Sequence, residues 1–153
     1  MYGDIHYFED FPPGFRYRTP ARTVFEADIV NFVALSGLYE DLFCNIEWIE
    51  QESPIKGGRY APIALLWAFA QGLTTRTGLY EKTFVAILGV DGMRITAPCL
   101  VGDTMHVEVE VKEARVTSRG DRGVLNSRFE LVNQRDETFM HYDMQQMVLC
   151  RPR

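Results

Sequence analysis

The feature that most constrains the fold is a run of 16 residues without a charged side chain, from Tyr60 to Thr75. The run contains Pro62, Gln71 and Gly72, and it is shorter than the roughly 20 apolar residues that a membrane-spanning helix needs. Alanine, leucine, isoleucine and aromatic residues would lie on all sides of a helix over 60–76, so we expect the rest of the protein to enclose that helix. Pro62 is acceptable only in its first turn.

The chain that follows predicts an antiparallel sheet. Residues 104–116 alternate strictly between an apolar set and a polar set, which is typical of a half-buried strand. A strand interrupted by Gly89 and Gly92 is predicted before it, over 84–95. Turns near 120–123 and 133–137 would lead into two further strands, so that a meander forms over 104–116, 124–132 and 138–149.

The N-terminal third predicts shorter elements. Residues 1–15 are rich in aromatics and prolines and should form an irregular arm packed on the domain. A strand is expected over 16–24, and Thr23 with Glu26 has the spacing of a capping box that would open a helix ending near Ser36-Gly37. Its apolar stripe would be Ala27, Val30, Phe32, Ala34 and Leu35. Residues 38–58 should form a loop with short helical turns.

Composition places the chain in one globular class. Its 153 residues match one ordinary domain, 1–153, and 46% hydrophobic and 24% charged residues fit neither a disordered nor a fibrous protein. The net charge of −5 comes without a concentrated basic face, so nucleic acid is not an expected partner. An enclosed helix followed by a long antiparallel sheet predicts an α+β fold in which the sheet wraps around a long central helix.

Cysteine usage and the N-terminus bear on the compartment. Cys44, Cys99 and Cys150 are an odd number without a CxxC pair, so neither a disulfide framework nor a metal site is expected. The opening residues are acidic and aromatic, whereas a signal peptide is basic and then apolar. We therefore expect a cytoplasmic protein in a reducing compartment, with no membrane partner.

Short motifs in a fixed order carry a family resemblance. Residues 7–11 (YFEDF) with Pro13-Gly14, residues 26–32 (EADIVNF) with Leu35-Ser36-Gly37, Ala97-Pro98 with 101–104 (VGDT), and Asn133-Gln134-Arg135 follow one another along nearly the whole chain. In this order they resemble the MaoC-like acyl dehydratases, whose members include (R)-specific enoyl-CoA hydratases. The resemblance implies a hot-dog fold, a homodimer, and an interface pocket for an acyl-CoA or acyl-carrier thioester. CoA is then part of the substrate, and no separate cofactor is implied.

The resemblance also implies a chemistry that this chain lacks the usual residues to perform. Hydration of a 2-enoyl thioester needs a base, an acid and donors for the enolate oxygen. The family places an Asp and a His five positions apart just after Leu-Ser-Gly, and here those positions hold Leu38 and Phe43. A second family motif, His-Gly at the start of the central helix, corresponds to Pro62-Ile63. All three substitutions replace polar chemistry with apolar side chains.

Several side chains remain candidates for the site. Glu40 and Asp41 are the carboxylates nearest to the lost pair, and either is a base if buried, or a solvated loop acid if not. Tyr39 and Tyr60 would donate hydrogen bonds to a ligand carbonyl or simply pack. None of the histidines replaces the missing one. His6 lies in the arm, and His106 lies on the charged face of its strand. His141 and Asp143 are two residues apart and so lie on the same face of their strand, which favours a structural contact.

Backbone donors and one arginine complete the candidate set. Amides at the start of the central helix, from Ala61 and Ile63 but not Pro62, would hold a thioester carbonyl whatever the side chains are. Arg94 occupies the family's position before the Ala-Pro turn and is the arginine expected to contact CoA phosphates, with a surface ion pair as the alternative.

Three functions stay open at this stage. The first is a hydratase or dehydratase whose acid and base moved to Glu40, Asp41 or a partner subunit. The second is a non-catalytic subunit of a heteromeric dehydratase, assembled with another hot-dog protein. The third is a thioesterase or an acyl-CoA binding protein, with Leu38 and Phe43 lining an apolar pocket for the acyl group.

Overall fold

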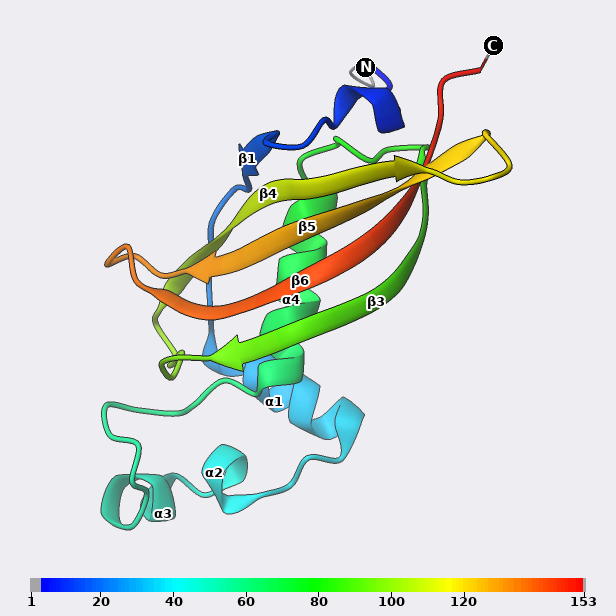
Figure 1. The fold of residues 1–153 in the computed structure, drawn as a ribbon. Helices are drawn as coiled ribbons and strands as arrows, with labels where there is room; N and C mark the ends of the chain where they lie inside the picture. The colour runs from blue at the N-terminus through cyan, green and yellow to red at the C-terminus, as the bar shows by residue number, and fades with distance from the viewer. Residues whose placement is uncertain (1–3, 153) are drawn as a thin grey trace.

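The structure, a computed structural model, describes residues 4–152 and is dominated by one antiparallel sheet. Along the sheet the strands follow the order β1-β4-β5-β6-β3, and β2 also pairs with β4. The long strands β4, β5 and β6 form the predicted meander, and β3 is the outer strand next to β6 (Figure 1). The strands are β1 Arg16–Arg18, β2 Arg22–Thr23, β3 Phe84–Ile95, β4 Thr104–Val116, β5 Arg122–Val132 and β6 Thr138–Leu149.

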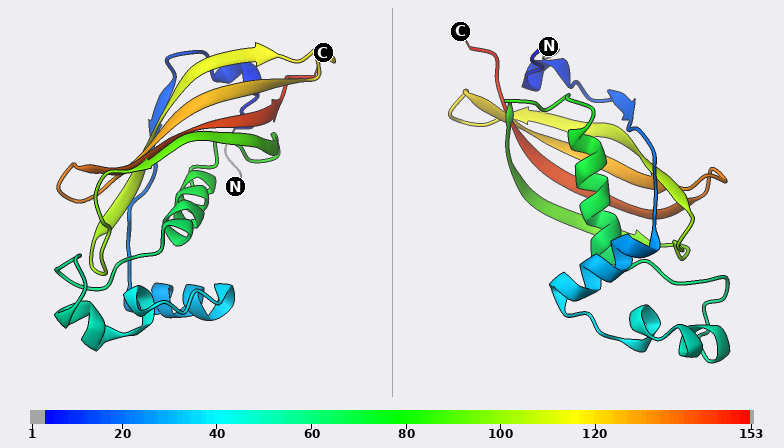
Figure 2. Two further views of the ribbon diagram at one scale, coloured as in Figure 1. Left: turned by 60° about the horizontal axis from the view of Figure 1, so that its bottom comes forward. Right: turned by 180° about the vertical axis from the view of Figure 1, so that it is seen from behind.

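One helix, α4 (Ile63–Thr75), lies against one face of this sheet. The curved strands pass over one side of α4, and the helices α1 to α3 lie beyond its N-terminal end (Figure 2). Leu66, Ala70 and Leu73 face the sheet and are at most 2% exposed. The other helical elements are the 3₁₀ turn η1 Phe8–Asp10, α1 Glu26–Ser36, α2 Asp41–Cys44 and α3 Ile46–Gln51. No helix among residues 4–152 is long and apolar enough to cross a membrane.

The long elements confirm the periodicity of the sequence. Residues 63–75 of the uncharged run form α4, so the helix begins three residues later than expected, and Pro62 immediately precedes its first residue. In β4 the apolar alternate residues Met105, Val107, Val109 and Val111 are all buried against the core. The predicted sheet wrapped around a central helix is thus the observed architecture.

The region from 16 to 29 differs from its prediction. The single strand expected over 16–24 is two short strands, because Pro20 has no amide to continue the ladder. Thr23 does not cap a helix; its hydroxyl lies 2.8 Å from that of Thr104. The helix α1 begins at Glu26, where Asp28 accepts the Phe25 amide at 2.8 Å and Arg22 at 2.8 and 2.9 Å.

The buried face of α1 is also not the predicted stripe. Val30 is 50% and Leu35 is 87% exposed, whereas Ile29 and Val33, four residues apart, are buried. Of the predicted stripe, Phe32 is half-buried and packs against the core, whereas the other four residues are exposed. Apolar residues occur on both sides of this helix, so their positions in the sequence did not identify the buried side. The helix does end at Gly37, which adopts the left-handed conformation with φ 75°.

The N-terminal arm is irregular, as predicted, and it packs firmly. Phe8 and Phe11 join Tyr80 in a second apolar cluster on the sheet, and the Phe11 and Tyr80 rings stack with centroids 4.9 Å apart. Residues 1–3 of the predicted arm lie outside the described residues.

Candidate functional site

Leu38 and Phe43, the two positions at which the resemblance leads us to expect an Asp and a His, lie in the main apolar core. Phe43 is 6% exposed and stacks on Tyr60, with ring centroids 6.1 Å apart and planes at 22°. Leu38 is partly buried and packs against the same core, as does Ile63 at the start of α4. The predicted residues Leu38, Phe43, Tyr60 and Ile63 therefore all belong to or pack against the main apolar core, and Phe43 and Tyr60 are in direct contact.

Arg59 anchors this cluster and was missed from the sequence. Its Nε donates to the Phe43 carbonyl at 2.7 Å, and its Nη1 lies 2.6 Å from Glu26 on α1. The side chain is only 11% exposed. The signal in the sequence was a lone cation directly before the uncharged run, where burial is expected. A buried guanidinium needs several fixed acceptors, so Arg59 was a candidate for a structural role.

At the start of α4, the backbone amides that are free to donate are only in part the ones expected from the sequence. The Ala61 amide is already engaged, because it donates to the Cys99 carbonyl at 2.8 Å. The first bond of the helix runs from Leu66 to Pro62 at 3.1 Å. Within residues 4–152 the amides of Ile63, Ala64 and Leu65 have no acceptor, which is the ordinary state of a helix start.

Tyr60 adds a neutral hydroxyl beside this helix start. Burial, and to a lesser degree the nearby Cys99, raises the pKa of Tyr60 above its usual value. The phenol therefore keeps its proton and is a hydrogen-bond donor, not a base, at neutral pH.

The nearby acidic and tyrosine candidates lie at the surface. Glu40 and Asp41 are both exposed, and the carboxylate of Asp41 accepts a hydrogen bond from the side-chain Nδ2 of Asn45 at 3.2 Å. Tyr39 is 69% exposed. All three flank the apolar cluster in sequence without entering it, which fits the solvated-loop alternative.

Arg94 lies near the end of β3, and that strand end lies close to the start of α4 (Figure 1). Its Nη1 donates to the neighbouring Met93 carbonyl at 2.9 Å. Within the described part of the chain Arg94 forms no ion pair. The guanidinium is exposed and available to an anion.

The histidines occupy structural positions, but one differs from its prediction. His106 faces outward on β4 as predicted, yet it is only 3% exposed. Arg18 from the neighbouring β1 covers it, with 3.3 Å between Arg18 Nη2 and His106 Nδ1. Because a guanidinium only donates, Nδ1 accepts and Nε2 carries the proton toward Glu108, 3.4 Å away.

His141 does not pair with Asp143. Asp143 instead accepts Arg128 at 3.4 Å, and the Nδ1 atom of His141 is buried without a partner in residues 4–152. His6 is half-buried, with its ring 6.3 Å from that of Phe11.

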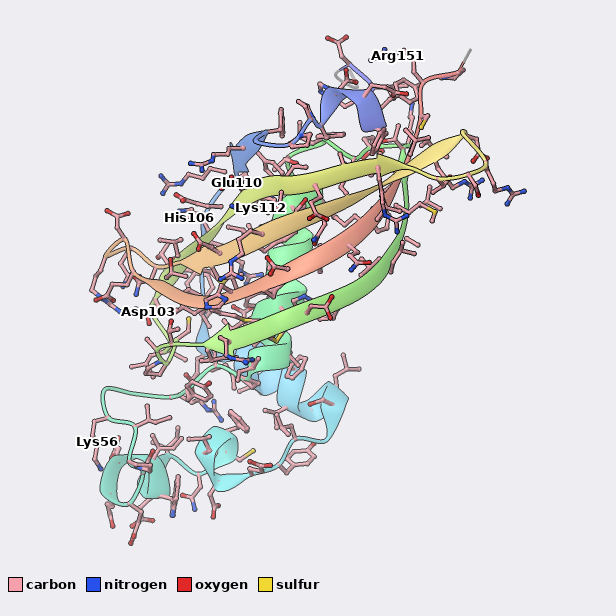
Figure 3. The ribbon with its side chains drawn as sticks, in the orientation of Figure 1. Lys56, Asp103, His106, Glu110, Lys112 and Arg151 are labelled. Carbon is pink, nitrogen blue, oxygen red and sulfur yellow. The ribbon has the colours of Figure 1, made fainter. Side chains whose placement is uncertain are left out.

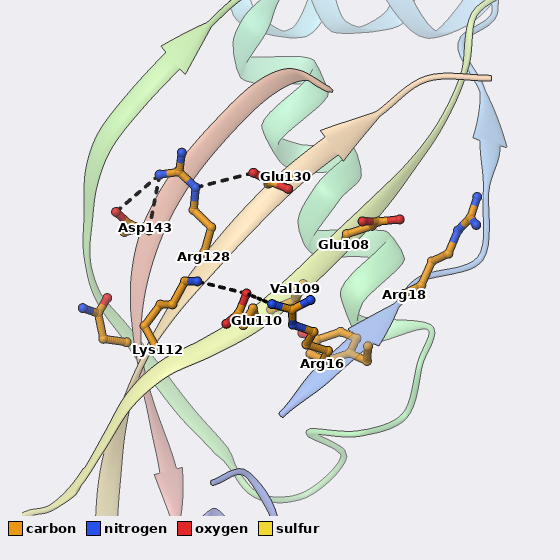
Figure 4. A pocket seen from close by; sticks show the side chains of 11 residues that line it. Arg16, Arg18, Glu108, Val109, Glu110, Lys112, Arg128, Glu130 and Asp143 are labelled. Carbon is orange, nitrogen blue, oxygen red and sulfur yellow. Dashed lines mark hydrogen bonds and ion pairs between the residues drawn. The ribbon is translucent and has the colours of Figure 1, made fainter. Parts of the chain in front are cut away.

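A charged groove of about 670 Å³ lies on the outer face of the sheet, away from α4 (Figure 4). Arg16 pairs with Glu110 at 2.8 Å, Lys112 pairs with the same carboxylate at 2.9 Å, and Arg128 reaches Asp143. Figure 3 labels Glu110 and Lys112, two residues of β4 that line this groove. The acids and bases compensate one another: Arg16–Glu110 and Arg128–Asp143 are ion pairs between neighbouring strands, and Lys112–Glu110 lies within β4.

The order of strands around α4 defines a hot-dog fold. A Mycobacterium tuberculosis protein with a double hot-dog fold matches with a TM-score of 0.77, at 23% identity, over 97% of this chain and 45% of that protein. A monoamine oxidase regulatory protein from Archaeoglobus fulgidus matches with a TM-score of 0.88, at 26% identity, over 99% of both chains.

Within this fold the comparisons point to one family. The chain is 34% identical over 110 residues to protein MaoC of Klebsiella aerogenes, covering 72% of this chain and 32% of that protein. A putative MaoC domain protein dehydratase from Chloroflexus aurantiacus matches at 26% identity with a TM-score of 0.85, over 97% of this chain and 41% of that one. No family model matches. The chain belongs to the MaoC-like dehydratase family and spans about a third of the length of its curated relative.

Proposed function

We propose that this chain binds an acyl-CoA or acyl-carrier thioester at the start of α4 without the family's Asp/His mechanism. The observation that supports the proposal is the apolar packing of Leu38, Phe43 and Tyr60 in the core, with Leu38 and Phe43 at the positions where the resemblance leads us to expect a proton-transfer pair. Neither leucine nor phenylalanine transfers a proton, so general acid–base catalysis at these positions is excluded by their chemistry. Their surface instead suits the acyl group.

The polar groups around this cluster suit the rest of a thioester. The Ile63 and Ala64 amides and the neutral Tyr60 hydroxyl are donors for a carbonyl oxygen. The unpaired Arg94 guanidinium suits a CoA phosphate.

The exposed edge of the sheet supports a dimer. The ladder partner of β3 is β6, and the opposite edge of β3 has no strand beside it among residues 4–152. A bare edge with apolar side chains is a template for pairing with a second chain. The large hydrophobic residues exposed along β3 are Phe84, Val85, Leu88 and Ile95.

Calorimetry with butyryl-CoA tests the binding proposal directly. We expect saturable binding, weakened in the Arg94→Ala variant. The absence of binding by butyryl-CoA and by longer acyl-CoA esters would refute the proposal. Arg115→Ala is the matched control, because Arg115 is also an exposed strand arginine but lies on β4.

The same protein incubated with crotonyl-CoA and butyryl-CoA separates the activities. We expect no loss of the double bond and no release of free thiol. Hydration that disappears in Asp41→Asn or Glu40→Gln would show a relocated acid–base mechanism, and thiol release from butyryl-CoA would show a thioesterase.

A second candidate function is that of a non-catalytic subunit in a heteromeric dehydratase. The bare β3 edge favours it, as does the match to less than half of longer proteins, one of which carries two hot-dog units in a single chain. Native mass spectrometry after mixing with a catalytic hot-dog protein tests it. Exclusive homodimers in such mixtures would contradict the idea.

A further inference from the structure

A cavity of about 360 Å³ lies at the C-terminal end of α4, remote from the helix start. It lies between α4, the beginning of β3 and the inner face of β6. In Figure 1 this is the end of α4 from which the chain continues into β3. Its volume lies within the range of about 300–1,000 Å³ that small-molecule sites occupy. The residues that matter below are Gln71, Tyr80, Phe84, Ile87 and Gln146.

Gln146 is the unusual residue in this cavity. It occupies an inward position on β6 between the buried residues Met144 and Val148, and it is only 2% exposed. Its Oε1 atom is buried and has no hydrogen-bond partner among residues 4–152. A buried amide oxygen without a partner is costly, so a glutamine at this core position points to a ligand group that bonds it.

The type of ligand group follows from the amide itself. The oxygen and nitrogen of a glutamine side chain exchange places by a simple flip, so either the amide oxygen or the NH₂ group can be the end that meets the ligand. A carboxylate or an ether satisfies only one of the two orientations. A hydroxyl both donates and accepts, so it satisfies Gln146 in either.

The remaining lining is neutral and partly apolar. Gln71 Nε2 lies 3.4 Å from the Tyr142 hydroxyl. Burial raises the pKa of Tyr80 to about 12, so this phenol is uncharged at neutral pH. Phe84 and Ile87 contribute apolar surface, and the charged residues Glu81 and Lys82 are exposed at the rim. The interior therefore suits an uncharged, partly apolar group and not a phosphate or carboxylate.

A strip of half-buried apolar surface leads from the proposed thioester site toward this cavity. Ile63, Trp67 and Gln71 follow one another at four-residue spacing and so lie on one side of α4. Ile63 and Trp67 are partly buried against the main core, as are Ile87 and Val90 of β3. At 1.5 Å per residue, Gln71 lies about 12 Å along the helix from Ile63, a span suited to a medium-length acyl chain.

We propose that the acyl group of the bound thioester carries a hydroxyl at its far end, and that Gln146 binds this hydroxyl inside the cavity. This inference rests on the proposed function, because the thioester is taken to lie at the start of α4. It narrows the substrate class from acyl thioesters in general to medium-chain esters with a distal hydroxyl.

The test compares pairs of saturated thioesters on the whole protein in its native oligomeric state. Octanoyl-, decanoyl- and dodecanoyl-CoA are each titrated by calorimetry beside their ω-hydroxy derivatives. For the chain length that reaches the cavity, we expect the hydroxy ester to bind about tenfold more tightly. Equal affinities within every pair would overturn the inference but leave the proposed function standing, whereas no binding by any ester would refute both.

Variants locate the effect at Gln146. In Gln146→Met, a change that keeps side-chain length and removes the amide, we expect the tenfold preference for the hydroxy ester to disappear. Gln145→Met is the matched control, because Gln145 is next to it on β6 but faces outward, and it should keep the preference. A preference retained in Gln146→Met would contradict the assignment. If Gln146→Met fails to fold, Gln146→Asn takes its place in the test. It keeps an amide on a shorter side chain, so we expect it to weaken the preference for the hydroxy ester.

Discussion

Gly123 on β5 is a residue for which the structure demands the absence of a side chain. A Cβ atom added there would overlap the ring of Phe8, which packs from the N-terminal arm. We expect Gly123→Ala to lower the free energy of unfolding by about 1–3 kcal/mol, because overpacking a buried site forces the ring out of place. Urea denaturation measures the change.

Two further variants make this a test of the ring contact itself. Gly89→Ala on β3 is the control, since a Cβ there has open space around it and its φ is not positive. In the background of Phe8→Ala, the cost of Gly123→Ala should largely vanish. A cost that stays the same in that background would show that the strain has another origin.

The environment of a single residue was predicted well where the local sequence determines it. It was predicted poorly where a segment distant in the sequence packs against the residue. Leu38 and Phe43 were expected to bring apolar side chains to their places in a motif, and both side chains pack in or against the apolar core. His106 was placed at the surface because the parity of its strand points outward, but Arg18 from β1 covers it. Arg59 was overlooked because its acceptors are a carbonyl and a carboxylate from distant segments.

At the scale of elements, Asp103 joins the turn before β4 to the hairpin between β5 and β6. Its carboxylate accepts the Leu100 amide at 2.9 Å, Gln134 Nε2 at 2.7 Å and Arg135 Nη1 at 3.2 Å. Burial acts to raise the pKa of Asp103, but these hydrogen bonds and the Arg135 charge outweigh it, so the pKa is lowered.

A lowered pKa makes a directional prediction. The ionised carboxylate stabilises the fold fully above the unfolded-state pKa of about 4, and this stabilisation is lost as the pH falls through the lower folded-state pKa. Asp103→Asn should therefore be less stable than wild type at pH 7, and the difference should shrink on acidification. Thermal unfolding between neutral and acidic pH measures it, with the exposed hairpin residue Asp136→Asn as control. A gap that widens toward acidic pH would contradict the role assigned to Asp103.

Arg59 makes a similar link between α1 and the segment that contains α2. The Arg59→Met change removes the guanidinium and with it the hydrogen bonds to Glu26 and to the Phe43 carbonyl. A hydrogen bond to a charged group contributes about 1.5–3 kcal/mol to the free energy of unfolding. We expect faster amide hydrogen exchange over residues 38–58 with little change in β4 to β6. Unchanged exchange in that segment would show that Phe43 is held by its packing alone.

The elements themselves were predictable where periodicity is strong. The run from Tyr60 to Thr75 specifies α4 because it is apolar on all sides and has no charged residue. The alternation over 104–116 specifies β4 because it leaves one dominant buried face. The start of α1 was not predictable from local spacing, because its cap is Asp28 held in place by Arg22 from β2. Pro20 was the signal for the break in the strand over 16–24, but the alternation of polar and less polar residues around it favoured one continuous strand.

At the scale of the whole molecule, the proposed dimer would form through the edge strand β3. Leu88 is 48% exposed in the middle of this strand, where a partner strand would cover it. A lysine there would place a charge inside the paired edge, which is how natural sheets prevent such pairing. We expect the wild type to be a dimer and Leu88→Lys to be a monomer in analytical ultracentrifugation.

The control for this change lies at another exposed strand position. Val116 is 54% exposed at the end of β4, far from β3 in the strand order, so Val116→Lys should remain dimeric. If thioester binding requires both subunits, the monomeric Leu88→Lys variant should also lose affinity for butyryl-CoA, whereas a site contained in one chain would keep it. A wild-type monomer at micromolar concentration would overturn the homodimer and leave pairing with a different hot-dog protein as the explanation of the apolar edge.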